Sequence, residues 1–169
     1  DRRQRPDVYK RQVKTFWLTW PIDFFNSPKR LVPGRRSLKI KTFHLSLIKV
    51  SVVSTGQAKI TSAYNLPCRY ILHTVGPIIN GHLTKKDCDL LAGCYTSCLQ
   101  LATDYHLESV AFCCISTGVF HFPNEKAAEI AIASTTDFLK QNDTTVKKVI
   151  FNVFKENDKE IYERLLGSN

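Results

Sequence analysis

The residues best suited to chemistry are Ser116, Thr117 and Gly118, which follow an apolar run at Val110–Ile115. Small side chains in such a turn let several backbone N–H groups approach one ligand, and consecutive N–H groups favour anions such as phosphate. An unbroken apolar run suits a strand that is covered on both faces of a parallel sheet. Ligands bind beyond the carboxyl ends of such strands. The sequence therefore predicts an anion-binding turn at the end of an internal strand.

Other titratable side chains are weaker candidates for catalysis or metal binding. His73 lies inside an apolar stretch, where a hydrogen-bonded core histidine is expected more often than a base. Cys94 and Cys98 have helix spacing, which could hold a metal with two further ligands but fits a helix core better. The sequence contains no Cys-x-x-Cys and no His-x-x-x-His. We assign no metal ligand and leave the catalytic residues unknown.

Charge and cysteine divide the 169-residue chain near position 50. Residues 1–50 hold 13 Lys and Arg, 3 Asp and Glu and no cysteine, whereas residues 51–169 hold 11 and 12 and all six cysteines. The net charge of +9 therefore says nothing about what the folded part binds, and we expect neither nucleic acid nor a membrane as partner. Cysteines inside expected core elements favour buried thiols and a reducing, cytoplasmic compartment.

Strand and helix patterns alternate from Thr55 onward. We expect strands at Ala58–Thr61, Arg69–Val75, Val110–Ile115 and Lys147–Phe154, and helices from Asp87 to about Tyr105, from Pro123 to about Lys140, and from Asn157 or Asp158 to Leu166. This order predicts an α/β fold with a mostly parallel sheet and right-handed crossovers. Residues 1–54 show no consistent apolar period, so we expect a non-native or disordered segment there, followed by one domain at 55–169.

Three separated blocks resemble the carboxyl-terminal two thirds of a macrodomain. They read TGQAKITSAYNLPCRYILHTVGP, then CCISTGVFHFP followed by NEKAAEIA, then VIFNVFKENDKEIYERLL. They cover about Thr55–Leu166, and the chain looks most similar to microbial protein-ADP-ribose hydrolases of the zinc-containing branch. The resemblance implies a three-layer αβα fold and a monomer that takes ADP-ribose or an ADP-ribosylated protein as its partner. It also implies removal of ADP-ribose from modified proteins.

The resemblance also assigns ligand-binding roles to individual residues. The diphosphate would be held by backbone amides of Ser116, Thr117, Gly118, Val119 and Phe120. Successive N–H donors suit two adjacent phosphates, and Gly118 lets the main chain come close. Phe120 would lie against the distal ribose, and Phe154 would stack on or near adenine, with Asn152 on the same face. Either Phe alone would be a core residue, but both fall at neighbouring strand ends, which favours the ligand role.

Residues 1–54 depart from the pattern of this family. They contain no Asn-Ala-Ala-Asn, no glycine cluster and no cysteine, where the family has its catalytic loop and zinc ligands. We therefore expect a macrodomain whose amino-terminal strands are missing or replaced. We expect no cofactor in this chain, although zinc belongs to intact members of the branch. Two alternatives stay open: a module that reads ADP-ribose or a related nucleotide without turnover, and an inactive truncated core with unpaired strand edges.

Overall fold

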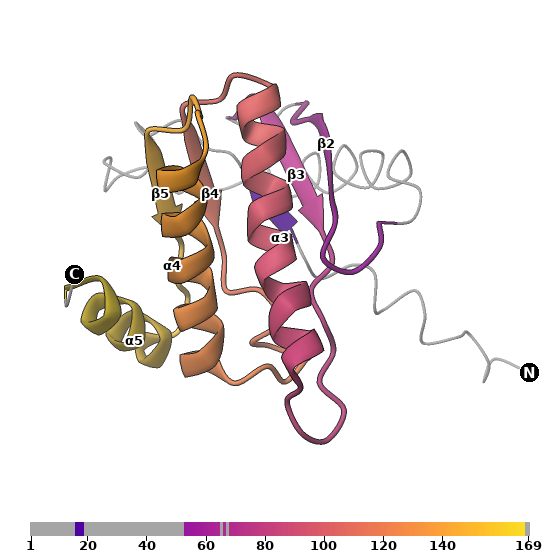
Figure 1. Ribbon diagram of the computed structural model, residues 1–169, viewed down its shortest axis with the longest axis vertical. Coiled ribbons are helices and arrows are strands. Elements are labelled where there is room, and N and C mark those ends of the chain that lie inside the picture. Colours follow the sequence, from indigo (N-terminus) through magenta and orange to yellow (C-terminus); the bar gives the residue numbers. More distant parts are fainter. Residues whose placement is uncertain (1–15, 19–52, 65, 67, 168–169) are drawn as a thin grey trace, which may run out of the picture.

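The computed structural model describes residues 16–18, 53–64, 66 and 68–167. Its strands are β1 (Phe16–Leu18), β2 (Ala58–Ser62), β3 (Tyr70–Thr74), β4 (Ser109–Phe112) and β5 (Lys148–Phe151). Its helices are α3 (Lys85–Asp104), α4 (Asn124–Gln141) and α5 (Glu156–Gly167). In Figure 1, α3 and α4 lie side by side across one face of the strands, and α5 lies beside α4. The expected α/β class is confirmed.

The strands pair in two groups. β3 pairs antiparallel with both β2 and β1, and β4 pairs parallel with β5. β1 also contacts β4, so it lies between the two groups (Figure 1). The sequence argument expected parallel strands joined by crossovers, and the β2–β3 pair corrects it. The connection between β2 and β3 is too short for a crossover, so these strands form a hairpin.

Residues 1–54, which we expected to be non-native or disordered, contain one described strand, β1. Phe16–Leu18 pair with Ile71–His73 of β3. The other described residues of this segment are Val53 and Ser54, which lead into the turn before β2. Nothing else of the segment belongs to the described residues, so its assignment as non-native or disordered stays a prediction.

Helix α3 begins at Lys85 because Thr84 caps it. The Thr84 hydroxyl oxygen accepts a hydrogen bond from the Asp87 N–H at 3.2 Å, and the Asp87 carboxylate accepts one from the Thr84 N–H at 3.0 Å. This reciprocal pair is a capping box. The helix expected from Asp87 therefore begins two residues earlier than predicted. Its buried residues are Leu91, Cys94, Tyr95, Cys98, Leu99 and Ala102.

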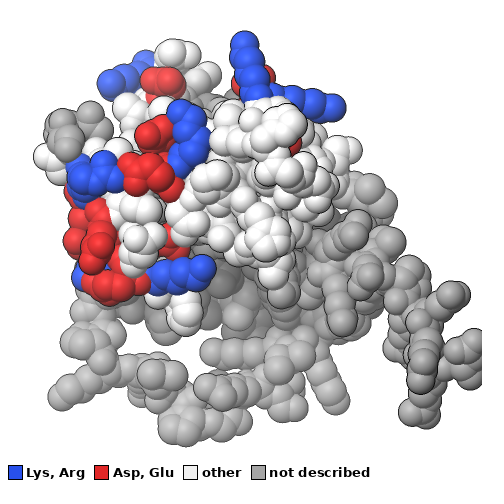
Figure 2. All heavy atoms as spheres, turned by 90° about the horizontal axis from the view of Figure 1, so that it is seen from below, with Lys and Arg blue, Asp and Glu red and all other residues white. Residues whose placement is uncertain are grey.

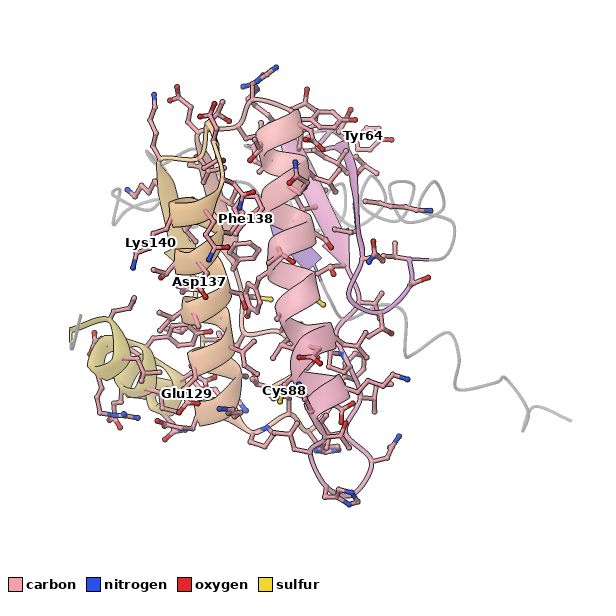
Figure 3. The ribbon with its side chains drawn as sticks, in the orientation of Figure 1. Tyr64, Cys88, Glu129, Asp137, Phe138 and Lys140 are labelled. Carbon is pink, nitrogen blue, oxygen red and sulfur yellow. The ribbon has the colours of Figure 1, made fainter. Side chains whose placement is uncertain are left out.

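The other helices also match their apolar patterns. Helix α4 begins at Asn124, directly after Pro123, as expected. Figure 3 shows Phe138 between α4 and α3, whereas Lys140 points away from the core. Helix α5 begins at Glu156, because the Lys159 N–H already donates to the Lys155 carbonyl at 3.1 Å. Asn157 and Asp158 therefore lie inside α5 and do not cap it, contrary to expectation.

Strands β4 and β5 end earlier than predicted. The Asn152 N–H donates to the Phe112 carbonyl at 2.6 Å, which closes the ladder between the two strands. Beyond this bond each chain leaves the sheet. Cys113, Cys114 and Ile115 therefore belong to the connection after β4, and Phe154 belongs to the connection after β5. The predicted ranges were too long because apolar residues continue past the last paired position.

The core lies between the strands and α3, α4 and α5. Its ring contacts join Tyr95 of α3 to Phe112 of β4 at 5.0 Å between centroids, and Phe151 of β5 to Tyr162 of α5 at 5.1 Å. Phe112 and Phe151 also stack across β4 and β5 at 6.3 Å. Aromatic contacts at these separations stabilise a fold beyond the area that they bury.

No helix among the described residues is long and apolar enough to cross a membrane.

Candidate functional site

The carboxyl ends of β4 and β5 lie at the same end of the molecule because the two strands are parallel. The connection after β4 contains a five-residue segment, Ser116–Phe120, which we call the amide loop. Between described residues, no hydrogen bond is donated by the backbone N–H of Ser116, Thr117, Gly118, Val119 or Phe120. An anion-binding loop requires consecutive donors that the protein leaves without a partner, so the assignment of this loop to an anionic ligand stays a prediction that its backbone fits.

Backbone carbonyl groups of the amide loop accept hydrogen bonds that hold its conformation. The His121 N–H donates to the Gly118 carbonyl at 3.1 Å, and the Phe122 N–H donates to the Ser116 carbonyl at 3.0 Å. Ser116 has φ of 62° and His121 has φ of 57°, a conformation that residues other than glycine rarely adopt. Backbone strain of this kind concentrates at ligand sites, where the surrounding structure holds it.

The side chains of the amide loop differ in exposure. Gly118 and Val119 are exposed, and a Cβ added to Gly118 would meet no atom within 4 Å. Ser116 and Phe120 are buried, at 8% and 6% exposure. The loop therefore presents its middle residues to solvent and anchors its two ends in the core. The burial of Phe120 matches a core residue, and its contact with a ribose stays a prediction.

The connection after β5 presents the other predicted residues. Asn152 is exposed, and the Phe154 side chain is 99% exposed. The sequence argument placed both side chains on one face of a strand. Both residues lie past the end of β5, so the alternation of side chains along a strand does not apply to them. A fully exposed Phe gains nothing from the core, which makes the core explanation of Phe154 wrong. It stands at the end of β5, the neighbour of the strand that leads into the amide loop.

A groove opens between the start of α4 and helix α5, next to both connections. It has a volume of about 840 Å³ and is lined by Asn124, Glu125, Lys155, Asn157, Glu160, Ile161 and Arg164. Figure 2 shows this end of the molecule, where side chains of both charges gather over α5 and uncharged side chains cover the middle. The Asn124 amide donates to the buried Asp158 carboxylate, and the Arg164 guanidinium donates to Glu125. These two bonds fix α5 against Asn124 and Glu125, the first two residues of α4.

The buried titratable groups are unsuited to general base or nucleophilic chemistry at neutral pH. His73 is 4% exposed and its Nε2 lies 2.8 Å from the Thr61 hydroxyl, and burial lowers its pKa to about 4. It is the satisfied core histidine that the sequence predicts. All six cysteines are free; Cys94 and Cys98 are buried as expected, whereas the other four are partly exposed. Burial raises the pKa of Cys113 to about 12 and of Cys114 to about 11. Thiols with such pKa values stay protonated and inert.

No cluster of three or more His, Cys, Asp or Glu side chains among the described residues is arranged to hold a metal ion. Cys94 and Cys98 lie in the core face of α3, and the Cys94 thiol donates to the Val75 carbonyl at 3.3 Å. They are helix-core residues. The described part of the chain therefore does not fit a zinc site, and no chemical step below involves one.

Comparison with known proteins assigns the family. A family model described as the Macro domain matches residues 40–131, which is more than half of the chain.

The chain belongs to the macro domain family.

The family match begins before Thr55, where the sequence resemblance was placed. Membership of the zinc-containing branch stays a prediction.

Relatives of this macro domain include hydrolases and ligand complexes. A protein-ADP-ribose hydrolase of Treponema medium is 59% identical over 113 residues, which are 67% of this chain and 43% of that protein. A macrodomain of Oceanobacillus iheyensis solved with ADP has a TM-score of 0.65 at 38% identity, over 76% of this chain and 66% of the other. A Trypanosoma brucei macrodomain in complex with ADP-ribose has a TM-score of 0.61 at 38% identity, over 68% and 47%. The chain spans less than half the length of the Treponema relative.

Two contacts at the site escaped the sequence argument. The sequence argument gives the segment after Val75 no role at the site, yet this segment touches the amide loop, where the Ile79 N–H donates to the Phe120 carbonyl at 2.9 Å. The bond between Asn124 and Asp158 joins residues 34 positions apart. No local pattern announces either contact, because the partners meet only when the strands are in register.

Proposed function

We propose that this macro domain binds ADP-ribose, with the diphosphate on the amide loop. The observation that carries the proposal is the set of consecutive backbone N–H groups, Ser116–Phe120, with no acceptor among the described residues. Two adjacent phosphates offer acceptors at the spacing of successive amides, and a bond from an amide to a charged oxygen is stronger than one to a neutral oxygen. Gly118 has open space around its Cα, so the diphosphate can approach the main chain.

The ends of ADP-ribose are assigned to the two strand-end connections. Phe154 stacks on or near the adenine, because its ring is 99% exposed on the connection after β5 and a base offers it a flat apolar partner. Asn152 donates or accepts a hydrogen bond at the nucleoside. The distal ribose lies toward Phe120, at the far end of the amide loop. Two similar macrodomains were solved with ADP and with ADP-ribose, which supports the same ligand here.

The reaction class that we propose is hydrolysis of protein-linked ADP-ribose. Water attacks C1″ of the distal ribose, the bond to the modified side chain breaks, and the side chain takes up a proton. The similarity to protein-ADP-ribose hydrolases supports this class. The amide loop contributes by holding the diphosphate and so fixing the ribose for attack. The titratable side chains considered above supply no base, so we assign no catalytic residue.

A second candidate is a reader that binds ADP-ribose without turnover. The sequence contains no Asn-Ala-Ala-Asn, the motif that the resemblance places in the catalytic part of the family. Binding through the amide loop needs no such motif. The two candidates therefore share a binding site and differ in the release of product.

The partner is free ADP-ribose or an ADP-ribosylated protein, and we propose a cytoplasmic monomer that binds neither nucleic acid nor membranes. All six thiols are free, which fits a reducing compartment. The basic excess lies in residues 1–50 of the sequence, which do not include the amide loop.

Isothermal titration of the full chain with ADP-ribose tests binding, with adenosine and ribose 5-phosphate as controls. We expect saturable heat for ADP-ribose and much weaker binding of either half. Equal binding of adenosine and ADP-ribose would contradict a site built on the diphosphate. Incubation with a mono-ADP-ribosylated protein then separates the candidates: free ADP-ribose in the supernatant identifies a hydrolase, and retained label with intact binding identifies a reader.

A further inference from the structure

Gly76 lies two residues after β3 and packs directly against the start of the amide loop. A Cβ built on Gly76 would stand 2.1 Å from the Ser116 Oγ and 2.5 Å from the Ile115 Cγ2. Both distances are shorter than any that real Cβ atoms keep. Gly76 is buried, and its φ lies outside the left-handed region. The position therefore requires glycine for space, because its backbone conformation is open to any residue.

Ser116 needs outside support for the conformation it adopts. Its φ of 62° is unfavourable for a residue with a side chain, and its buried hydroxyl has no hydrogen-bond partner among the residues that the structure describes. A local bond from the hydroxyl to the backbone, the usual compensation for such a residue, is therefore missing. A strained residue persists only where its surroundings leave no alternative. The bare Cα of Gly76 permits this conformation, since the Ser116 side chain fills the space that a Cβ would occupy.

The same segment holds the far end of the loop. The Ile79 N–H donates to the Phe120 carbonyl at 2.9 Å, and both residues are buried. Residues 76–79 thus contact the first and the last residue of the amide loop. Between described residues, the N–H groups of the three residues that separate Ser116 from Phe120 donate no hydrogen bond.

We propose that Gly76 is a positioning residue for the amide loop: its bare Cα permits Ser116 the left-handed conformation that keeps the loop's N–H groups directed at the diphosphate. The proposal rests on the proposed ADP-ribose site and adds to it the residue that sets its geometry. Gly76 touches no ligand. A side chain at this position should move Ser116 and so disorganise the donors while the adenine end, on the connection after β5, stays in place.

The test compares Gly76→Ala with wild type in the full chain, using ADP and adenosine as separate titrants. We expect the affinity for ADP to fall by about tenfold or more and the affinity for adenosine to stay within about twofold. The control is Phe138→Leu in α4, a core substitution 14 residues from the start of the helix, or about 20 Å away. It lowers thermal stability and should change neither affinity. Equal loss of both affinities in Gly76→Ala, or no loss of either, would overturn the proposal.

A double variant tests whether the effect passes through Ser116. In Gly76→Ala/Ser116→Gly the closer of the two opposing side chains is gone, although Ile115 remains, and glycine adopts the positive φ freely. ADP affinity should therefore recover from that of Gly76→Ala toward that of Ser116→Gly alone. This comparison also applies if Gly76→Ala fails to fold. A double variant that recovers neither folding nor ADP affinity relative to Gly76→Ala would refute the role of Ser116. Wild type that binds no ADP-ribose would instead refute the proposed function.

Discussion

The helix layer and the strand-end connections are built by opposite rules. In α3 and α4, the residues that face the strands are small or apolar, and the buried ones are exposed by 8% at most. In the connections after β4 and β5, Phe154 is 99% exposed, Ser116 is strained, and successive amides find no acceptor among the described residues. The first region gains free energy from burial, and the second keeps unsatisfied groups that a ligand can satisfy.

This difference predicts that substitutions in the two regions affect different measurements. A change in the helix layer should lower the free energy of unfolding and leave affinity per folded molecule unchanged. A change in the connections should lower affinity and leave the free energy of unfolding unchanged. Proteins commonly retain strained, unsatisfied groups at functional sites at some cost in stability. Four substitutions, ordered by expected effect, can break or sharpen the contrast.

The largest effect is expected from truncation in the helix layer. Leu99 of α3 is 0% exposed, and Leu99→Ala should lower the free energy of unfolding by about 3–4 kcal/mol through lost burial and the cavity left behind. The same change at Leu166 of α5, which is 47% exposed, is the matched control and should cost about 0.5 kcal/mol or less. Urea denaturation measures both. Similar losses at the two positions would show that α3 is not a core element.

The next effect belongs to the amide loop. Gly118→Glu places a side chain and a negative charge where the diphosphate binds, and should weaken ADP-ribose binding by about 3 kcal/mol, or roughly a hundredfold. Its melting temperature should equal that of wild type, because a Cβ at Gly118 meets no atom within 4 Å. Gly167→Glu, which adds the same charge at another open position, is the control. Calorimetry showing equal affinity for both variants would remove the diphosphate from this loop.

A smaller effect, confined to stability, is expected from acid. Burial lowers the pKa of His73 from 6.5 to about 4, so the unfolded chain binds a proton between these values and the folded chain does not. The free energy of unfolding should therefore fall as pH drops from about 6.5 to 4, by about 2–3 kcal/mol at most. The control is His73→Gln, which has the same carboxyl groups as wild type. The difference between the two proteins in the pH dependence of the free energy of unfolding therefore isolates His73. A parallel pH dependence in that variant would show that His73 is protonated inside the fold.

The smallest effect is expected at Phe154. Phe154→Ala should weaken ADP-ribose binding by about 1–2 kcal/mol through loss of stacking on adenine, and Phe154→Tyr should retain it. Stability should not change, since the ring is 99% exposed. Titration with ribose 5-phosphate, which has no base, provides the internal control. If affinity for that compound falls as far as affinity for ADP-ribose, the ring does not contact adenine.

The sequence predicts the helix layer well because a helix can be recognised from the local spacing of its apolar residues. The apolar residues of α3 and α4 recur at the helical period, and the face that they form is the buried one. Boundaries were less accurate where a cap decided them. Thr84 competes with Asp87 as the first cap, and only the reciprocal hydrogen bonds between them place Thr84 outside the helix.

The candidate site was predictable in composition and not in geometry. Small residues after an apolar strand identify the amide loop, but they do not reveal the positive φ of Ser116 or its contact with Gly76. These depend on how the connection after β3 meets the one after β4. The hairpin of β2 and β3 was missed because strand spacing shows that two strands exist without showing their direction.

The central claim is that backbone amides of Ser116–Phe120 bind the diphosphate, and amide NMR of the full chain during titration with ADP-ribose tests it most directly. We expect large, saturable shifts for the N–H signals of these five residues, because each gains an acceptor, with the same dissociation constant as calorimetry. The N–H signals of α3, which are already bonded within the helix, should move little. Saturable binding that leaves the signals of Ser116–Phe120 unchanged would contradict the account.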